Sequence, residues 1–298
     1  MQLRGLGYLV IETSESGAWH DYLVDAIGLM PGEPPNDHGL TWFRMDDRSY
    51  RIAVEDAVND SYVAGWELAS STSWDDAVTE LESAGVLVEH CDAEQARRRG
   101  VGGLARLADP FGNRHELFWG HQVSEAPFDS PKGMSGFCTA SLGLGHVLYA
   151  VPSSDVALSF FRDTLGMKVT DYFTWGENSA WFLRCNERHH AVAFVDLPLP
   201  GGPGVNHFML EARTLADVGR ALDRSIDMGF EIVNSLGQHS NDKCVSYYMR
   251  SPGTANVEVG FEQLRINDDD WEVIAWTGRG DYWGHRGPFM DEIADSKN

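Results

Sequence analysis

The chain repeats itself, and this internal repeat limits its possible folds more than any other feature. Leu6 opens the stretch LGYLVIETSESGAWHDYLVDAIGLM, and Leu144 opens the similar stretch LGHVLYAVPSSDVALSFFRDTLGM. Each begins with a short apolar run, continues through serines that can cap a helix, and stops near a glycine. A second pair has the same order: VAGWELASSTSWDDAVTELESAG from Val63 and VNHFMLEARTLADVGRALDRSIDMG from Val205. A fold of repeated strand–helix units follows.

The repeat also predicts how the chain divides. Each copy of the second pair is followed by a Pro-containing loop and a last strand, ADPFGNRHELFWG in one half and RSPGTANVEVGF in the other. The unit is therefore a strand, a helix and several further strands, repeated four times. We predict an α+β chain of two domains, residues 1–130 and 142–298, each with two βαβββ modules and curved mixed sheets. The Pro/Gly/Ser-rich residues 126–141 are the predicted linker.

The helix of the third module can be followed residue by residue. Ser153 or Ser154 can cap its start, and a glycine ends it. Its apolar side is predicted to carry Val156, Phe160 and Leu165.

Charge restricts the partners. The 298 residues include 23 Lys and Arg against 45 Asp and Glu, so the net charge is 23 − 45 = −22. Such an acidic chain is a poor ligand for nucleic acid or an anionic membrane. The sequence has no apolar run of about 18 residues that would predict a membrane span, and Glu12 interrupts the first apolar stretch too early for a signal peptide. The four scattered cysteines suit reduced thiols, so we expect a cytoplasmic protein.

Alignment of the two halves singles out three positions. It sets Tyr8, Gly65 and Glu116 opposite His146, His207 and Glu258, and both glutamates stand six residues after a proline. Histidine nitrogen and carboxylate oxygen are metal ligands, whereas tyrosine and glycine in these positions leave the first half without a comparable set. We therefore predict a metal site in the second half alone.

Strand alternation supports this metal site. His146, His207 and Glu258 each lie in the middle of an expected strand, from which side chains can converge on one face of a curved sheet. A single strand histidine is more often a hydrogen-bonded core residue, but the repeat placement of all three favours ligands. Buried Glu258, between two valines, would be costly without a positive partner. Two imidazoles and one carboxylate are typical of non-haem Fe(II) oxygenases, although Mn(II) suits the same ligands.

At these residues the sequence resembles the type I extradiol dioxygenases of the vicinal oxygen chelate superfamily, above all the 2,3-dihydroxybiphenyl 1,2-dioxygenases. The resemblance covers essentially the whole chain and is carried by LGHVLYAV, RCNERHHAVAF, NHFMLEA and LGQHSNDKCVSYYMRSPGTANVEVGF. Ser251 and Thr254 depart from the family pattern in the loop before Glu258, and neither belongs to the ligand set. The resemblance implies the vicinal oxygen chelate fold and a catechol-cleaving enzyme.

The resemblance also implies catalytic roles. His190 would be the acid–base catalyst on the oxygen side of the substrate, a role that suits an imidazole near neutral pH. His239 and Tyr248 would lie beside the catechol oxygens, where hydrogen bonds favour the deprotonated diol. His189 is expected to point to the opposite side of the same strand and to be structural.

Four further residues match substrate-binding positions of the family: Leu148, Phe182, Asn241 and Asp242. Leu148 and Phe182 would wall the pocket, but both would also suit an ordinary core. Asn241 and Asp242 could equally serve to form the turn in HSND.

The implied reaction is insertion of both atoms of O2 beside the diol of a catechol, which opens the ring. The aromatic segment DYFTWGENSAWF and the tail around Trp276, Tyr282 and Trp283 favour a roomy apolar pocket, hence a bicyclic substrate such as 2,3-dihydroxybiphenyl or 1,2-dihydroxynaphthalene. The resemblance further implies a homo-oligomer. Two alternatives remain: a glyoxalase-like metal isomerase, which would need a fourth protein ligand, and a non-enzymatic small-molecule binding protein, which would need no ligand set.

Overall fold

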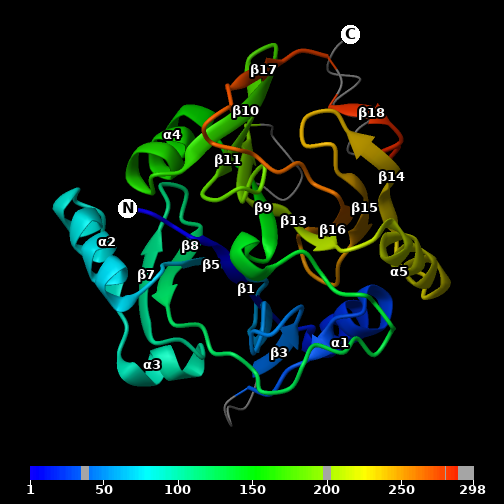
Figure 1. Ribbon diagram of the computed structural model, residues 1–298, viewed down its shortest axis with the longest axis horizontal. Helices are drawn as coiled ribbons and strands as arrows, with labels where there is room; N and C mark the ends of the chain where they lie inside the picture. The colour runs from blue at the N-terminus through cyan, green and yellow to red at the C-terminus, as the bar shows by residue number, and fades with distance from the viewer. Residues whose placement is uncertain (35–39, 197–202, 279, 288–298) are drawn as a thin grey trace.

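The computed structural model describes residues 1–34, 40–196, 203–278 and 280–287. The first half contains two modules (Figure 1). The first comprises β1 (Gly5–Thr13), α1 (Ser16–His20) continuing as the π-helix η1 (Asp21–Ile27), β2 (Met30–Pro31), β3 (Leu40–Arg44) and β4 (Ile52–Asp56). The second comprises β5 (Ser61–Glu67), α2 (Ser71–Ser83), β6 (Glu89–His90), α3 (Ala93–Arg98), β7 (Gly103–Ala108) and β8 (Arg114–Trp119).

The second half follows the same order after the short 3₁₀ turn η2 (Ala140–Leu142). Its first module comprises β9 (Gly145–Ala150), α4 (Ser154–Leu158) continuing as the π-helix η3 (Ser159–Thr164), β10 (Lys168–Trp175), β11 (Asn178–Arg184) and β12 (Val192–Val195). Its second comprises β13 (Gly204–Ala212), α5 (Leu215–Asp227), β14 (Ile232–His239), β15 (Val245–Arg250) and β16 (Asn256–Phe261). The tail adds β17 (Ile274–Trp276) and β18 (Asp281–Trp283).

The strands form two mixed sheets with one plan. The first has the order β2-β3-β4-β1-β5-β8-β7-β6, and the second the order β17-β10-β11-β12-β9-β13-β16-β15-β14-β18. In every module the first strand runs parallel to the last, as β1 does to β4 and β13 to β16. The modules of one half join through antiparallel first strands, β1 with β5 and β9 with β13. The predicted α+β fold of four βαβββ modules is confirmed, whereas the boundaries 1–130 and 142–298 stay a prediction.

Local signals explain where the helices begin. Ser153 caps α4 and accepts a hydrogen bond from the backbone of Val156, as one of the two predicted serines. Thr214 caps α5 in the same way. The predicted apolar side of α4 is wrong at Val156, which is 41% exposed, because the short helix widens into the π-turns of η3 and turns Ala157 and Phe161 inward instead.

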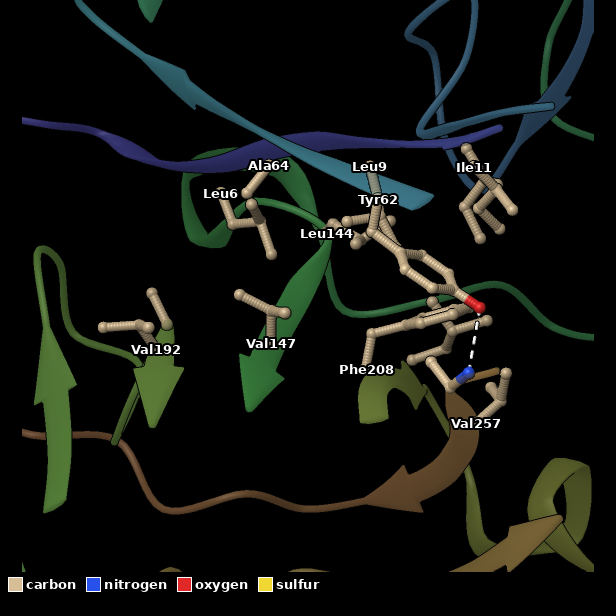
Figure 2. Close-up of a cluster of buried hydrophobic side chains, with 14 of the residues drawn as sticks. Leu6, Leu9, Ile11, Tyr62, Ala64, Leu144, Val147, Val192, Phe208 and Val257 are labelled. Carbon is tan, nitrogen blue, oxygen red and sulfur yellow. Dashed lines mark hydrogen bonds between the residues drawn. The ribbon is translucent and has the colours of Figure 1, made fainter. Parts of the chain in front are cut away.

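The two sheets share one hydrophobic core. Strand residues of the first half pack against strand residues of the second, as Figure 2 shows for Leu6, Leu9, Ile11, Tyr62, Ala64, Leu144, Val147, Val192, Phe208 and Val257. A polar contact crosses the same interface: the backbone N–H of Ala255 donates to the hydroxyl of Tyr62 at 2.9 Å (Figure 2). Strands β9, β13 and β16 therefore bury one face in this core, and their opposite face is left for a site.

The corresponding face of the first sheet is filled with aromatic rings. Tyr8 stacks on Phe118 with ring centroids 4.5 Å apart, and Trp42 stacks on Tyr50 at the same distance. Gly65 lies under this cluster, and a Cβ atom there would overlap the ring of Tyr8. Tyr8 and Gly65, which stand where the second half has His146 and His207, thus fit each other. The ring of Tyr8 fills the space that a side chain at Gly65 would need.

No helix within the described ranges is long and apolar enough to span a lipid bilayer.

We predict that Gly65→Ala destabilises the protein by about 1–3 kcal/mol, because the new methyl group must displace the buried ring of Tyr8. Chemical denaturation of both proteins measures the change. Gly17→Ala is the matched control, since a Cβ at Gly17 meets no atom within 4 Å, and alanine favours a helix over glycine. Equal stability of the Gly65→Ala variant and the wild type would contradict the packing described for Tyr8.

Candidate metal centre

Three adjacent strands bring together the three predicted metal ligands. Met209 of β13 lies opposite His146 of β9 on one side and opposite Glu258 of β16 on the other, and His207 lies two residues before it. The Nε2 atoms of His146 and His207 are 3.3 Å apart. An oxygen of Glu258 lies 3.2 Å from the first and 3.7 Å from the second. One donor atom from each residue lies within 4.8 Å of the others, which is a suitable spacing for one cation.

The polar atoms of this cluster lack partners that the protein itself could supply. His146, His207 and Glu258 are buried, with 2%, 5% and 1% of their surface exposed. Neither oxygen of Glu258 accepts a hydrogen bond, and a buried carboxylate without compensation is costly. A divalent cation would compensate it. Nδ1 of His207 lies 3.0 Å from Oδ1 of Asn206; a hydrogen bond donated there leaves Nε2 free as a ligand.

Electrostatics favour the protonation states that bind metal. Burial lowers the pKa of His207 to about 3, so its imidazole is neutral. Burial raises the pKa of Glu258, but the imidazoles of His146 and His239 outweigh it and hold that pKa well below its usual value. Neutral imidazoles and an ionised carboxylate are the forms that coordinate a metal ion.

His190 lines the same cavity as the cluster. Its ring centroid lies 4.1 Å from that of His146 and 5.0 Å from that of Phe182. Burial, followed by the positive influence of His146, lowers its pKa well below the usual value.

His189 does not lie on the opposite face of a strand from His190. Both residues precede β12, in a turn, so the expected alternation of faces is wrong for them. Their Nδ1 atoms are only 3.0 Å apart. Nε2 of His189 instead faces Asp171, 3.2 Å away, in a fully buried pair. His189 therefore lies in the wall behind His190.

His239 and Tyr248 form the polar side of the cavity. Nε2 of His239 is 2.8 Å from the hydroxyl of Tyr248 and 3.4 Å from Glu258. Burial and the charge of Glu258 raise the pKa of Tyr248 well above its usual value, which keeps the phenol protonated. Burial lowers the pKa of His239, but its close contacts with the carboxylates of Asp281 and Glu258 outweigh it and raise that pKa well above the usual value.

Sequence reasoning missed Asp281 and His285, which support His239. Nδ1 of His239 lies 3.0 Å from Asp281, and the same carboxylate oxygen lies 2.6 Å from Nδ1 of His285. The tail that carries these two residues has no counterpart in the first half, so the repeat offered no signal for them. The only available signal was an acid and a histidine four residues apart in DYWGH.

Asn241 and Asp242 were predicted either to bind substrate or to form a turn, and their positions suit both roles. Both line the cavity. One oxygen of Asp242 accepts from the backbone N–H of Cys244 at 3.0 Å, as a turn residue does, and the other accepts from Gln263 at 3.1 Å. The Nδ2 atom of Asn241 is buried without a hydrogen-bond partner, so it is free to donate to a molecule in the cavity.

The rest of the cavity wall is apolar. Leu148 and Phe182 belong to it as expected, and the aromatic segment singled out in the sequence adds Phe173, Trp175 and Ala180, whereas Val195 was not predicted. The space between these walls that no protein atom fills, open solvent at the mouth included, is about 880 Å³. Of the three tail aromatics, Trp276 stacks behind Phe173 at 6.0 Å. Tyr282 and Trp283 are 57% and 49% exposed and are not part of the wall.

Comparison with known proteins gives the same result by an independent route. Residues 143–259 match the glyoxalase/bleomycin resistance protein/dioxygenase superfamily, and residues 6–56 match the dihydroxybiphenyl dioxygenase BphC D1 family. Over 293 residues, 96% of each chain, the sequence is 40% identical to biphenyl-2,3-diol 1,2-dioxygenase of Paraburkholderia xenovorans. It is 33% identical over 297 residues, 96% of this chain and 97% of the relative, to an iron-dependent extradiol dioxygenase of Rhodococcus jostii.

A solved structure agrees with these relatives. The crystal structure of BphC, described as a halotolerant catechol dioxygenase, superimposes with a TM-score of 0.91 at 34% identity, covering 97% of this chain and 96% of that one. The chain therefore belongs to the extradiol ring-cleaving dioxygenases of the vicinal oxygen chelate superfamily. The alternatives of a glyoxalase-like isomerase and of a binding protein without catalysis find no support in these full-length relatives.

We predict that His146→Ala, His207→Ala and Glu258→Ala each abolish stoichiometric metal binding, because two remaining ligands hold a divalent ion too weakly against water. Metal content after purification and dialysis measures this. Glu116→Gln is the matched control in the first half, where Arg99 and Arg106 already pair with the carboxylate, and it should leave metal content unchanged. Full metal occupancy in the Glu258→Ala variant would exclude this ligand set.

Proposed function

We propose that this protein cleaves the ring of a catechol outside its diol, with O2 as co-substrate and Fe(II) held by His146, His207 and Glu258. One observation carries the proposal above all: a buried cluster of two imidazoles and an unpaired carboxylate opens onto an apolar cavity. Both atoms of O2 enter the product. The carbon–carbon bond beside the diol breaks, and a 2-hydroxymuconate-type compound is formed.

The donor set supports Fe(II) and is compatible with Mn(II), since both accept two imidazoles and one carboxylate with open coordination positions. When bound, the metal supplies a Lewis acid for the two diol oxygens and a redox centre that lets the ring react with O2. The iron-dependent relative from Rhodococcus jostii favours iron. We infer that residues 142–298 supply this whole site.

The polar side of the cavity suits the diol. A catechol hydroxyl must lose a proton when it binds a metal, and hydrogen bonds to the resulting anion favour this loss. Tyr248 and His239 are already joined by a 2.8 Å contact beside Glu258. With its Nδ1 directed at Asp281, His239 keeps Nε2 turned towards the cavity. We assign this pair to orienting the diol and to donating hydrogen bonds to its deprotonated oxygen.

The reaction also needs an acid–base group near the site where O2 reacts. Among the described residues that line the cavity, His190 is the one imidazole that belongs neither to the metal ligands nor to the pair of His239 and Tyr248. Its neutral form can donate a hydrogen bond to an oxygen atom or take up a proton, and the protonated ring can give that proton back. Phe182 packs against its ring at 5.0 Å and helps to exclude water from that side. His190 is therefore assigned as the acid–base catalyst.

The substrate we favour is bicyclic. The apolar residues Leu148, Phe173, Ala180 and Val195 form one cluster that extends the cavity beyond the polar end. A second aromatic ring would bury its surface there, and ordinary hydrophobic transfer would favour it over a monocyclic diol. Comparison of kcat/KM for 2,3-dihydroxybiphenyl, 1,2-dihydroxynaphthalene and 3-methylcatechol tests this preference. A homo-oligomer stays a prediction, which light scattering in solution can test.

We predict that 2,3-dihydroxybiphenyl and O2 yield a yellow product whose colour depends on pH, as expected for an extradiol cleavage product with an ionisable enol. Anaerobic mixing should give no such colour. The readouts are visible absorbance, oxygen uptake and iron content of the enzyme. A colourless dicarboxylic acid would mean cleavage between the two hydroxyls and would overturn the proposed reaction.

We predict that His190→Ala lowers kcat by about 10²–10⁴-fold, the usual contribution of a general acid–base group, while iron content and anaerobic catechol Kd stay close to those of the wild type. The reason is that His190 acts on the oxygen side and not on the bound diol. His189→Ala is the neighbouring control and should cost stability, with kcat in the folded fraction little changed. A larger loss of kcat in the His189 variant would reverse the two assignments.

A further inference from the structure

Gln263 is a buried side chain behind the cavity that the proposed mechanism does not yet use. It follows β16 and is 2% exposed. Its amide makes three hydrogen bonds: Oε1 accepts from Nη1 of Arg188 at 3.0 Å, and Nε2 donates to Asp242 at 3.1 Å and faces Nδ1 of His190 at 3.2 Å. Every donor and acceptor of the amide group except one lone pair is thereby engaged.

The chemistry of its neighbours fixes the orientation of this amide. A guanidinium has donors only, so the group that faces Arg188 must be the oxygen. An ionised carboxylate has acceptors only, so the group that faces Asp242 must be the nitrogen. A flipped amide would set N–H against N–H on one side and oxygen against oxygen on the other. Both contacts therefore require the same orientation.

Arg188 cannot turn away from Gln263. Its side chain is fully buried and also donates to Glu211 at 2.5 Å and to the backbone oxygen of Cys138 at 2.6 Å. Glu211 is in turn bound by Arg265 and by the backbone N–H of Gln263. The amide is therefore hydrogen-bonded to a network in which Arg188, Glu211 and Arg265 fix one another in place.

This orientation determines the tautomer of His190. The two hydrogens on Nε2 of Gln263 point to Asp242 and to Nδ1 of His190, so Nδ1 must be the acceptor. In a neutral imidazole the proton then resides on the other nitrogen. We propose that Gln263 is a positioning residue that holds His190 in the tautomer with its proton on Nε2, the nitrogen on the cavity side.

His189 provides a competing arrangement, whereas Asp242, 4.0 Å from Nδ1 of His190, already accepts from Gln263 and from the backbone of Cys244. The Nδ1 atom of His189 lies 3.0 Å from the same nitrogen. If His189 carries protons on both nitrogens, its Nε2 donates to Asp171 and its Nδ1 donates to Nδ1 of His190, which reinforces the proposed tautomer. If His189 carries its proton on Nε2 alone, towards Asp171, its Nδ1 accepts, and the proton of His190 would lie on Nδ1, where it would face the N–H of Gln263. The fixed amide favours the first arrangement.

The consequence for catalysis depends on the proposed function. A proton on Nε2 makes His190 a donor towards the cavity at the start of the reaction, so that its first act is to give a hydrogen bond to an oxygen atom. With the proton on Nδ1, the same ring would present a bare lone pair and could act only as a base.

The tautomer can be measured without turnover. Full-length protein with nitrogen-15-labelled histidine, freed of iron to avoid paramagnetic broadening, gives separate signals for protonated and bare ring nitrogens. The spectrum of the His190→Ala variant identifies the His190 signals by their loss. We expect a protonated Nε2 and a bare Nδ1 in the wild type. A protonated Nδ1 would overturn the proposal, whether or not the enzyme cleaves catechols.

Kinetics of the iron-loaded enzyme provide the second test. Gln263→Met keeps the shape but removes the donor, so kcat should fall by about 10–100-fold, as is usual when the group that orients a working histidine is lost. KM for the catechol and iron content should stay near the wild-type values. Gln263→Asn, a milder change, retracts the amide and should lower kcat in the same direction.

Exposed Gln122 of the first half offers a control for the chemical change, and Gln122→Met should leave kcat unaltered. If Gln263→Met and Gln263→Asn lose only thermal stability and keep kcat within about twofold in the folded fraction, Gln263 is structural and the proposal fails. Absence of ring cleavage in the wild type would instead refute the proposed function, and the nitrogen-15 spectrum would still decide the tautomer.

Discussion

A carboxylate buried in the middle of a sheet is the constraint on which the rest of this structure depends. Glu258 is 1% exposed on the face of β16 opposite to Val257 and Val259, with no hydrogen-bond donor of good geometry for either oxygen. Such a charge destabilises a fold unless something positive compensates it. The neutral ring of His207 does not compensate it, and His239, whose pKa is raised, lies between Glu258 and the second carboxylate of Asp281. The arrangement is therefore complete only with a cation.

The first half meets the same constraint in a different way. Glu116 occupies the position equivalent to Glu258 and is also 1% exposed. Its oxygens accept hydrogen bonds from Tyr8 at 2.6 Å and from Arg99 at 3.1 Å, and Arg106 lies 3.2 Å away. Guanidinium groups are permanently charged, so this carboxylate is satisfied by side chains alone. The duplicated position thus exists in two forms, one closed by arginines and one left open to a metal.

What could be predicted from the sequence follows the repeat. His146, His207 and Glu258 were found because both halves present comparable landmarks, and because strand alternation indicates which side chains share a face. The α+β class and the four modules were predicted for the same reason. The helix of the third module was predicted less well, since π-turns change the period that an α-helical pattern assumes.

Residues outside the repeat were not predicted. Asp281 and His285 lie in a tail that has no copy in the first half, and Gln263 reaches His190 across 73 residues of sequence. Their roles depend on hydrogen bonds between segments whose proximity no local pattern encodes. The pair His189 and His190 shows a different cause of error. An apolar flank favoured a strand, but β12 begins only at Val192, so the alternation rule was applied to a turn.

The contact between Tyr62 and Ala255 links the two halves in a way that their separate sheets do not suggest. Tyr62 belongs to β5, yet its hydroxyl binds the backbone just before the strand that carries Glu258. Gly253 in the same loop lies against Tyr62 and Trp19, where a Cβ atom would come within 2.7 Å of the Tyr62 hydroxyl and 3.1 Å of the Trp19 ring. The first half, which has no ligand set, therefore helps to fix the position of the loop that leads to Glu258 in the second half. The two halves are therefore not free to change independently, since a substitution at Tyr62 or Trp19 in the first half would also shift the loop before the ligand Glu258.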